Sequence, residues 1–475
     1  MDFFANLVEN DALEWMRNDI ILERDSLYFD FSASGLASRV IERRIQSILG
    51  RYANTHSANS RNANFIGEVY NGAKVHLKEL LELEEDFFVI PSGYGASGAM
   101  KKYQEIKGLY IPPKLRAHLG DLLKGVAKKR VLIGGYEHHS NDISLREAFC
   151  EVVRIPLKNG LMSVDFLKSL LDSGIDSRDS QKDSQDSRKD SRQKSRDSHD
   201  SRVDSPKDSP KIDFASINIA SNVSGIIAPY AQISQILRTQ NIDIAFDLAA
   251  ISPHSNVDSH LFDSAFLSPH KLIGGIGACG ILLIRKNSFE STLPPTFSGG
   301  GSVKYVSEHS HFYIDDIERR EDSGTPPILP LLRAVLAYQY RNEIGLDFIA
   351  KREKVLYEIL LSELKQISGI ALYGVDLDAS YLPIISFNVD GISPYDLAWE
   401  LSYNYGIETR AGCSCAGVYG HYLTNIDEIK DIALLDSGKA QKPAWLRVSL
   451  HYSHNGNDIE RFINALKRTI KRLRR

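Results

Sequence analysis

Cysteine is scarce in this sequence, and long apolar runs are missing. The 475 residues include four cysteines, which is too few for a disulfide framework and typical of a reducing compartment. No stretch approaches the ~20 apolar residues of a membrane-spanning helix. The start, MDFFANLVEN, lacks the basic residues that open a secretory signal. We therefore expect a cytoplasmic protein that does not associate with a membrane.

An excess of charge of either sign is also missing. The chain has 57 basic and 61 acidic residues and a formal net charge of -4, so no overall attraction to nucleic acid or anionic membrane is expected. The ending KRTIKRLRR is locally basic, but it continues an apolar helical pattern and is interpreted as a solvated helix face.

Two domains are expected from the length and from the hydrophobic pattern. Residues 36–270 alternate short apolar runs with helical patterns, which predicts an α/β domain around a mostly parallel sheet. The expected strands are 87–90, 130–135, 214–220, 242–247 and 280–286. A long helix after GTPP then leads to a smaller domain with a strand at 382–389. The predicted division is an N-terminal segment packing with the small domain (1–27), a large domain (28–325) and a small C-terminal domain (326–475).

Residues 172–211 break this pattern. The segment repeats Asp-Ser with a basic or polar residue, as in DSRDSQKDSQDSRKDSR, and has almost no apolar side chains. Such a composition cannot bury enough surface to offset the entropy of ordering, so we predict a disordered surface insertion. A scaffold or binding protein whose working part is this insertion remains an alternative.

Lysine 271 stands between a Ser-Pro-His turn and a run of glycines, in SPHKLIGGIGACG. A buried ammonium is costly unless it is paired or deprotonated. The residue is therefore either a surface turn lysine or an amine kept reactive for a Schiff base.

Other polar residues follow predicted strands, where open α/β sheets gather their active sites. Asp247, Asn222 and His138 each occupy such a position, and the glycine-rich turn GYGASGAM opens a helix that could hold a phosphate. A phosphate cradle, an acid, an asparagine and a lysine are the parts of a pyridoxal 5'-phosphate site. The turn and helix-cap alternatives for Asp247 and Asn222 remain open.

Four motifs together carry a resemblance to a known family. SPHK, EHHSN, SNVSGI and RAGCSCAG resemble those of the class V aminotransferases, the fold-type-I branch of pyridoxal-phosphate enzymes that includes the cysteine desulfurases. The resemblance runs from about 27–37 to 445–467, apart from the insertion. It implies a large domain with a mostly parallel central sheet and a smaller α+β C-terminal domain.

The resemblance also implies roles for individual residues. Lys271 would form the Schiff base and move the Cα proton, His138 would stack on the ring, and Asp247 would pair with its nitrogen. Asn222 would bond the phenolic oxygen. The phosphate contacts would come from Ala96, Ser97, Ser268 and His270, with Thr325 reaching the phosphate of a neighbouring subunit. A homodimer is therefore expected, and His139 is expected just behind the contacting residues.

The stretch ETRAGCSCAG points to the reaction. By the same resemblance, Cys415 would take the sulfur of L-cysteine as a persulfide while L-alanine leaves, for delivery to an acceptor protein. Arg447 would grip the substrate carboxylate by a bidentate contact, with Arg410 at the start of the cysteine loop. The alternatives are a class V aminotransferase, or a C–S or C–Se lyase, acting on another amino acid, and a loop cysteine without a role.

Two further points qualify the resemblance. No metal is expected, because a zinc site from Cys413, Cys415 and His421 would lack a second ligand pair. Ala250 and Lys101 depart from the family pattern, where glutamine and asparagine are common, and Ala250 removes one bond to the phenolic oxygen.

Overall fold

The computed structural model describes residues 2–9, 13–57, 59–173, 211–434, 437–440 and 442–474. Apart from its first two residues and its last, the predicted insertion at 172–211 lies outside the described residues. Each helix in the described part of the chain is too short or too polar to cross a bilayer.

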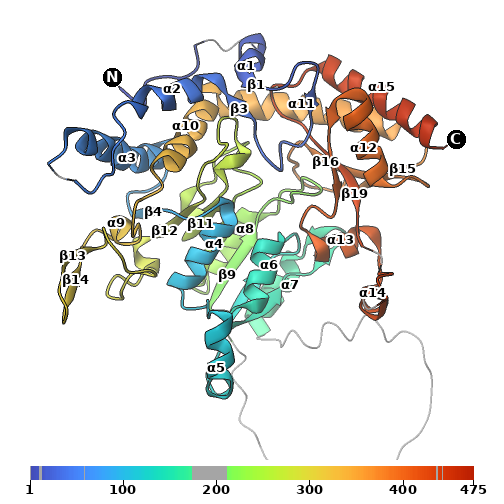
Figure 1. Ribbon diagram of the computed structural model, residues 1–475. Helices are drawn as coiled ribbons and strands as arrows, with labels where there is room; N and C mark the ends of the chain where they lie inside the picture. The colour runs from blue at the N-terminus through green and yellow to red at the C-terminus, as the bar shows by residue number, and fades with distance from the viewer. Residues whose placement is uncertain are drawn as a thin grey trace, which may run out of the picture.

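A seven-stranded sheet forms the centre of the larger unit (Figure 1). Its strands, in spatial order, are β4 (Phe87–Pro91), β12 (Ile281–Arg285), β11 (Ser264–Leu267), β10 (Asp243–Asp247), β9 (Phe214–Asn218), β5 (Lys129–Ile133) and β6 (Cys150–Arg154). β12 is antiparallel to both of its neighbours, and the pairs from β11 to β6 are parallel. The predicted α/β class with a mostly parallel sheet is confirmed, and each predicted strand is present within two residues of its bounds.

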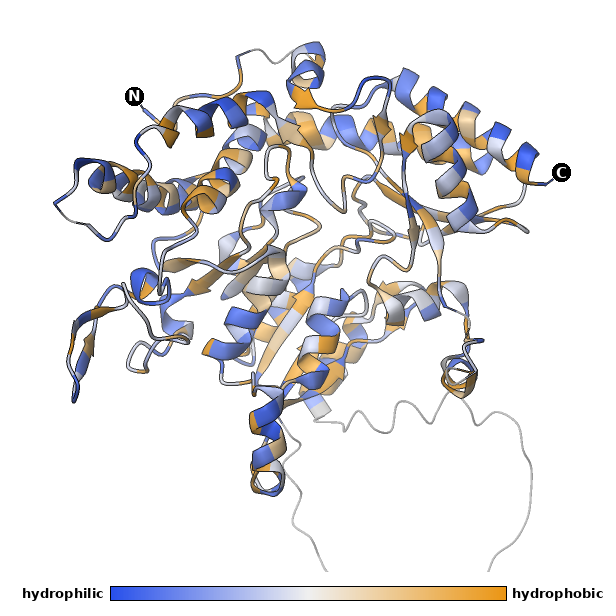
Figure 2. Ribbon diagram, viewed as in Figure 1, coloured by the Kyte–Doolittle hydropathy of each residue, from blue (hydrophilic) through white to orange (hydrophobic). Residues whose placement is uncertain are grey.

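Helices pack against this central sheet. The principal ones are α2 (Arg39–Leu49), α3 (Arg61–Leu80), α4 (Gly95–Ile106), α6 (His139–Glu147), α7 (Val164–Ser173), α8 (Tyr230–Arg238) and α10 (Ile328–Ile344). α4 packs on β11 and β12, whereas α10 packs against α2 and α3. The strands of the central sheet are strongly apolar because helices cover them (Figure 2).

The smaller unit is built on a four-stranded antiparallel sheet. Its order is β15 (Ile370–Tyr373), β16 (Ile384–Val389), β19 (Trp445–Ser449) and β18 (Arg410–Gly412). Its helices are α11 (Leu346–Lys365), α12 (Pro394–Tyr405) and α15 (Gly456–Leu473), which share a second hydrophobic core. The sequence placed the boundary between domains before α10. In the structure α10 and the first turn of α11, with Ile349, belong to the larger core, and the smaller core takes up α11 from Leu356 onward.

The N-terminal residues contact both units. β2 (Leu27–Tyr28) pairs in parallel with β17 (Ile407–Glu408), and Arg17 forms an ion pair with Asp458 at the start of α15. The amides of Leu7 and Val8 donate to Glu343 on α10, each at 2.7 Å.

The remaining elements of the described residues are shorter or lie at the periphery, and they include three short 3-10 turns. They are α1 (Leu13–Asp19), β1 (Ile20–Ile21), β3 (Ala37–Ser38), α5 (Pro113–Lys124), β7 (Leu157–Lys158), β8 (Leu161–Met162), β13 (Val303–Val306), β14 (His311–Tyr313), α9 (Ile317–Arg320), α13 (Gly417–Thr424) and α14 (Glu428–Leu434).

Candidate active site

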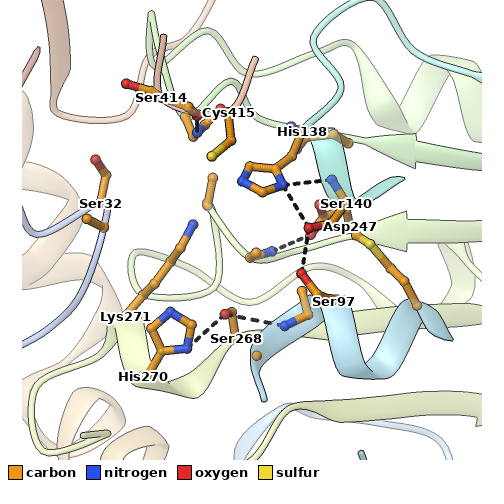
Figure 3. Close-up of a pocket in the computed structure, with 18 of the residues that line it drawn as sticks. Ser32, Ser97, His138, Ser140, Asp247, Ser268, His270, Lys271, Ser414 and Cys415 are labelled. Carbon is orange, nitrogen blue, oxygen red and sulfur yellow. Dashed lines mark hydrogen bonds between the residues drawn. The ribbon is translucent and has the colours of Figure 1, made fainter. Parts of the chain in front are cut away.

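A cavity of about 230 Å³ lies at the carboxyl ends of the central strands. It is lined by the larger unit and by β18, β19 and the loop that follows β18. Eleven of the twelve residues predicted for the site line it: Ala96, Ser97, His138, Asn222, Asp247, Ser268, His270, Lys271, Arg410, Cys415 and Arg447. Figure 3 shows how several of them converge.

Lys271 ends the short 3-10 turn Pro269–Lys271 that follows β11. A Cβ on Gly275 would lie 1.9 Å from the Pro269 carbonyl oxygen, so only glycine lets the chain fold back beside this turn. Burial lowers the pKa of the Lys271 amine to about 8, and the nearby Asp247 carboxylate opposes that shift. About a tenth of the amine is therefore neutral near pH 7. Because Lys271 is half-buried and lines the cavity, it is not an exposed lysine of a surface turn.

His138 is the N-cap of α6 and presents its ring to the cavity (Figure 3). Its Nδ1 accepts a hydrogen bond from the Ser140 amide at 3.1 Å. Burial, reinforced by the charge on Lys271, lowers the pKa of the imidazole to about 3. The ring therefore stays neutral at physiological pH, as a residue that stacks on an aromatic ligand requires.

Two buried carboxyl groups lie near the carboxyl ends of the central strands, and one of them, Asp247, lines the cavity. Asp247, the last residue of β10, is only 3% exposed, and burial raises its pKa. Glu137 accepts from the Gly134 amide at 2.7 Å and the Asn218 amide at 2.9 Å, and burial raises its pKa to about 7. Sequence reasoning missed Glu137, although it stands within the quoted motif EHHSN.

The start of α4 forms a cradle with the turn before Lys271. The N-cap, Tyr94, makes no side-chain capping bond, and Gly95 has a φ of 57°. A Cβ on Gly95 would come within 3.0 Å of both the His270 ring and the Ser268 hydroxyl. The Ser268 hydroxyl oxygen also accepts from the Ala96 amide at 3.4 Å. A helix N-terminus without a side-chain cap, held close to a serine and a histidine, suits a phosphate.

Asn222 and Arg447 make contacts that the sequence did not predict. The Asn222 Nδ2 donates to the Ser414 carbonyl at 2.7 Å, while its buried Oδ1 has no hydrogen-bond partner among the described residues. Arg447 is 2% exposed and donates to Asp30 at 2.6 Å, and its Nε has no partner among the same residues. The Arg410 Nη1 lies 3.7 Å from the Asp30 Oδ2. Asp30 was not singled out, although it stands within residues 27–37, where the resemblance begins.

The two neighbouring cysteines have different surroundings. Cys415 lines the cavity, and Figure 3 shows its sulfur directed inward above Lys271. Cys413 packs against the larger hydrophobic core instead. Among the described residues no three His, Cys, Asp or Glu side chains gather as metal ligands do, so Cys413, Cys415 and His421 do not form a zinc cluster there.

Thr325 does not line the cavity of its own chain. It is exposed, and its hydroxyl accepts from the Asn54 side chain at 3.0 Å. The structure of one chain therefore leaves its predicted role, at a neighbouring subunit's phosphate, as a prediction.

Comparison with known proteins identifies relatives. Residues 205–462, just over half of the chain, match the family model described as aminotransferase class-V. A probable cysteine desulfurase of Xylella fastidiosa is 26% identical over 431 residues, covering 88% of this chain and 85% of that protein. A probable cysteine desulfurase of Borreliella burgdorferi is 29% identical over 268 residues, covering 55% of this chain and 59% of that protein.

Solved structures share the fold over nearly the whole chain. An apo cysteine desulfurase from Thermococcus onnurineus superposes with a TM-score of 0.73 at 19% identity, covering 96% of this chain and 98% of that one. The cysteine desulfurase CsdA of Escherichia coli gives a TM-score of 0.70 at 18% identity, covering 98% and 99%. These likenesses establish the fold, in agreement with the predicted large and small units.

Proposed function

We infer that this chain, which belongs to the aminotransferase class-V family, is a pyridoxal-phosphate-dependent cysteine desulfurase. The observation that carries the proposal is the presence of the Lys271 amine and the Cys415 thiol in one cavity. Cys415 distinguishes this function from transamination, because a transaminase has no use for a thiol at that position. The names of the relatives in Xylella and Borreliella agree with it.

The residues of the cavity fit pyridoxal phosphate. The cradle at Gly95 and Ser268 would hold its phosphate, His138 would stack on its ring, and Asp247 would pair with its nitrogen. Asn222, with an unpartnered buried oxygen, offers a further polar contact. When bound, the cofactor supplies an electron sink for the carbanion formed at the substrate's Cα.

The protein's own groups then account for the remaining chemistry. Neutral Lys271 takes the proton from the substrate's Cα, which its lowered pKa of about 8 favours. The Cys415 thiolate attacks the substrate sulfur, so that an S–S bond forms as the C–S bond breaks. The carbon fragment keeps the electron pair and gains a proton to become L-alanine. L-Cysteine and one thiol thus give L-alanine and one persulfide, with no outside oxidant.

Two arginines would bind the substrate carboxylate. Arg447 and Arg410 both line the cavity, and each lies near Asp30. The carboxylate of L-cysteine would share Arg447 with Asp30, because the Nε of that guanidinium has no partner among the described residues. A guanidinium suits this role since its planar donors match a carboxylate.

We also propose a homodimer in a reducing, cytoplasmic compartment. Tyr94 at the rim of the cavity is 92% exposed, so its aromatic side chain is open to contact with a second subunit. In such a dimer Thr325 of the neighbouring subunit would contact the phosphate, as the family resemblance implies. Sedimentation of the purified protein as a monomer would contradict this proposal. The four cysteines are all unpaired, and the persulfide would pass to a thiol of an acceptor protein.

The experiment that tests the function is an assay of purified protein with L-cysteine and a thiol reductant. Alanine and sulfide are measured together, and the proposal expects them in equal amounts. Alanine without sulfide transfer, or turnover of other amino acids only, would favour the aminotransferase or lyase alternatives. L-Serine, which lacks the sulfur, is the matched control substrate and is expected to give no alanine.

A further inference from the structure

The backbone that carries Cys415 is strained. Ser414 has a φ of 52° and Cys415 a φ of 59°, so two consecutive residues that are not glycine adopt the left-handed conformation. This conformation is sterically disfavoured for any residue that carries a Cβ. Strain of this kind persists only where surrounding contacts hold it in place. The segment from Cys413 to Gly417 must therefore be fastened to its surroundings.

His139 provides two of those contacts, one to Cys415 itself and one to Gly417. Its backbone amide donates to the Cys415 carbonyl oxygen at 2.8 Å. Its ring Nε2 accepts from the Gly417 amide, also at 2.8 Å. A Cβ at position 417 would lie only 3.0 Å from that ring nitrogen, so glycine permits the close approach.

A second set of contacts holds Ser414. Asn222 donates to its carbonyl oxygen at 2.7 Å, and the Trp445 indole donates to its hydroxyl at 3.3 Å. Asn222 lines the cavity, and Trp445 is the first residue of β19 in the smaller sheet. His139 differs from Asn222 because it does not line the cavity, and its role there cannot be cofactor contact.

We propose that His139 is a positioning residue. Its two hydrogen bonds, called the latch below, hold the segment from Cys413 to Gly417 over the cavity with Ser414 and Cys415 in the left-handed conformation. His138 and His139 thus divide the work at the start of α6, the first facing the cavity and the second holding the cysteine segment. The latch needs an unprotonated Nε2, and burial lowers the pKa of His139 in the direction that preserves it. The importance of the latch for sulfur transfer rests on the proposed function, whereas its existence does not.

The test compares His139→Gln with His139→Leu in the full-length protein loaded with cofactor. Glutamine can place its carboxamide oxygen near the position of Nε2 and still accept from Gly417, but leucine cannot accept. Hydrogen exchange of the Gly417 amide is the first readout. Loss of one hydrogen bond should speed that exchange roughly three- to tenfold in the leucine variant, with the glutamine variant close to wild type.

Alkylation of Cys415 by iodoacetamide, located by peptide mass mapping, is the second readout, and Cys413 is the internal control. If the latch holds the segment, the alkylation rate of Cys415 should change in His139→Leu and should return to the wild-type value in His139→Gln. The alkylation rate of Cys413 should stay the same in both variants. Cofactor absorbance should be the same in both variants. If the leucine variant does not fold, His139→Asn replaces it, because its shorter side chain cannot reach Gly417.

Equal exchange and alkylation in wild type and the leucine variant would overturn the latch, as would equal effects of leucine and glutamine. Neither readout depends on turnover of L-cysteine. If the variants behave as expected while wild-type protein forms no alanine, the latch stands and the proposed function fails.

Discussion

Half-buried Asp30 forms an ion pair at 2.6 Å with the buried Arg447, at the end of the cavity that Arg410 also lines. The arginine that the sequence assigns to the substrate carboxylate is thus already paired with a carboxylate of the protein. Burial lowers the pKa of Arg447 while Asp30 opposes that shift, so Asp30 compensates the buried guanidinium charge before substrate arrives.

Asp30→Asn should therefore destabilise the protein and sensitise it to carboxylate ligands. Removing one partner of a buried pair typically costs about 3–5 kcal/mol, so we expect a lower thermal midpoint. L-Alanine, which carries the same carboxylate as the substrate, should raise that midpoint more in the variant than in wild type. An equal ligand effect in both proteins would show that Asp30 does not compete with the substrate.

The lowered pKa of Lys271 predicts how cofactor uptake depends on pH. Only the neutral amine reacts with an aldehyde, and its fraction rises as the pH passes through about 8. Cofactor-free protein mixed with pyridoxal phosphate and then borohydride should acquire label at Lys271 at a rate that levels off above that pH. A rate that keeps rising to pH 10, as for N-acetyl-lysine, would mean that burial does not lower this pKa.

Glu137 predicts a pH-dependent stability. Its pKa is raised from 4.5 to about 7 in the folded protein, so the folded state binds the extra proton between these values. The associated stabilisation is complete below pH 4.5 and is lost as the pH rises through 7; it amounts to about 3 kcal/mol. As the pH rises from below 4.5 to above 7, the free energy of unfolding of wild type, measured relative to that of Glu137→Gln, should fall by that amount. A difference that is independent of pH would contradict the burial argument.

Replacement by serine should have very different effects at the two cysteines of the loop. Cys415→Ser should retain cofactor and the spectral change on adding L-cysteine but lose alanine formation, because a serine hydroxyl without a dedicated base is a poor nucleophile at neutral pH. Cys413→Ser, the matched control, should lose much less, since Cys413 packs against the core. Normal turnover by the Cys415 variant would remove the persulfide mechanism.

The sequence predicted the strands from local patterns, and most of the cavity residues through the resemblance of its motifs to a known family. Apolar runs such as IDIAFD mark buried strands, and the ends of parallel strands converge in space, which brings Asp247 and Lys271 together. The bond between Asn222 and Ser414 could not be predicted in this way. It joins residues far apart in the chain and depends on how the small unit packs on the large one.

The missed residues have the same explanation. Asp30 reaches Arg447 because it lies alongside β19, where a single parallel bridge joins Asp30 to Ser449, a contact that no hydrophobic pattern announces. Likewise, the attribution of α10 to the larger core follows from its packing against α2 and α3. Periodicity identifies a buried helix but does not say which core buries it.

The most direct test of the central claim locates the sulfur. Cofactor-loaded protein is given one equivalent of L-cysteine without reductant, and its thiol peptides are then alkylated and analysed by mass spectrometry. The account predicts one additional sulfur atom on the peptide of Cys415, bound at Cys415 and not at Cys413, together with one equivalent of L-alanine. Alanine formed with both cysteines unmodified, or sulfur found on Cys413 alone, would contradict it.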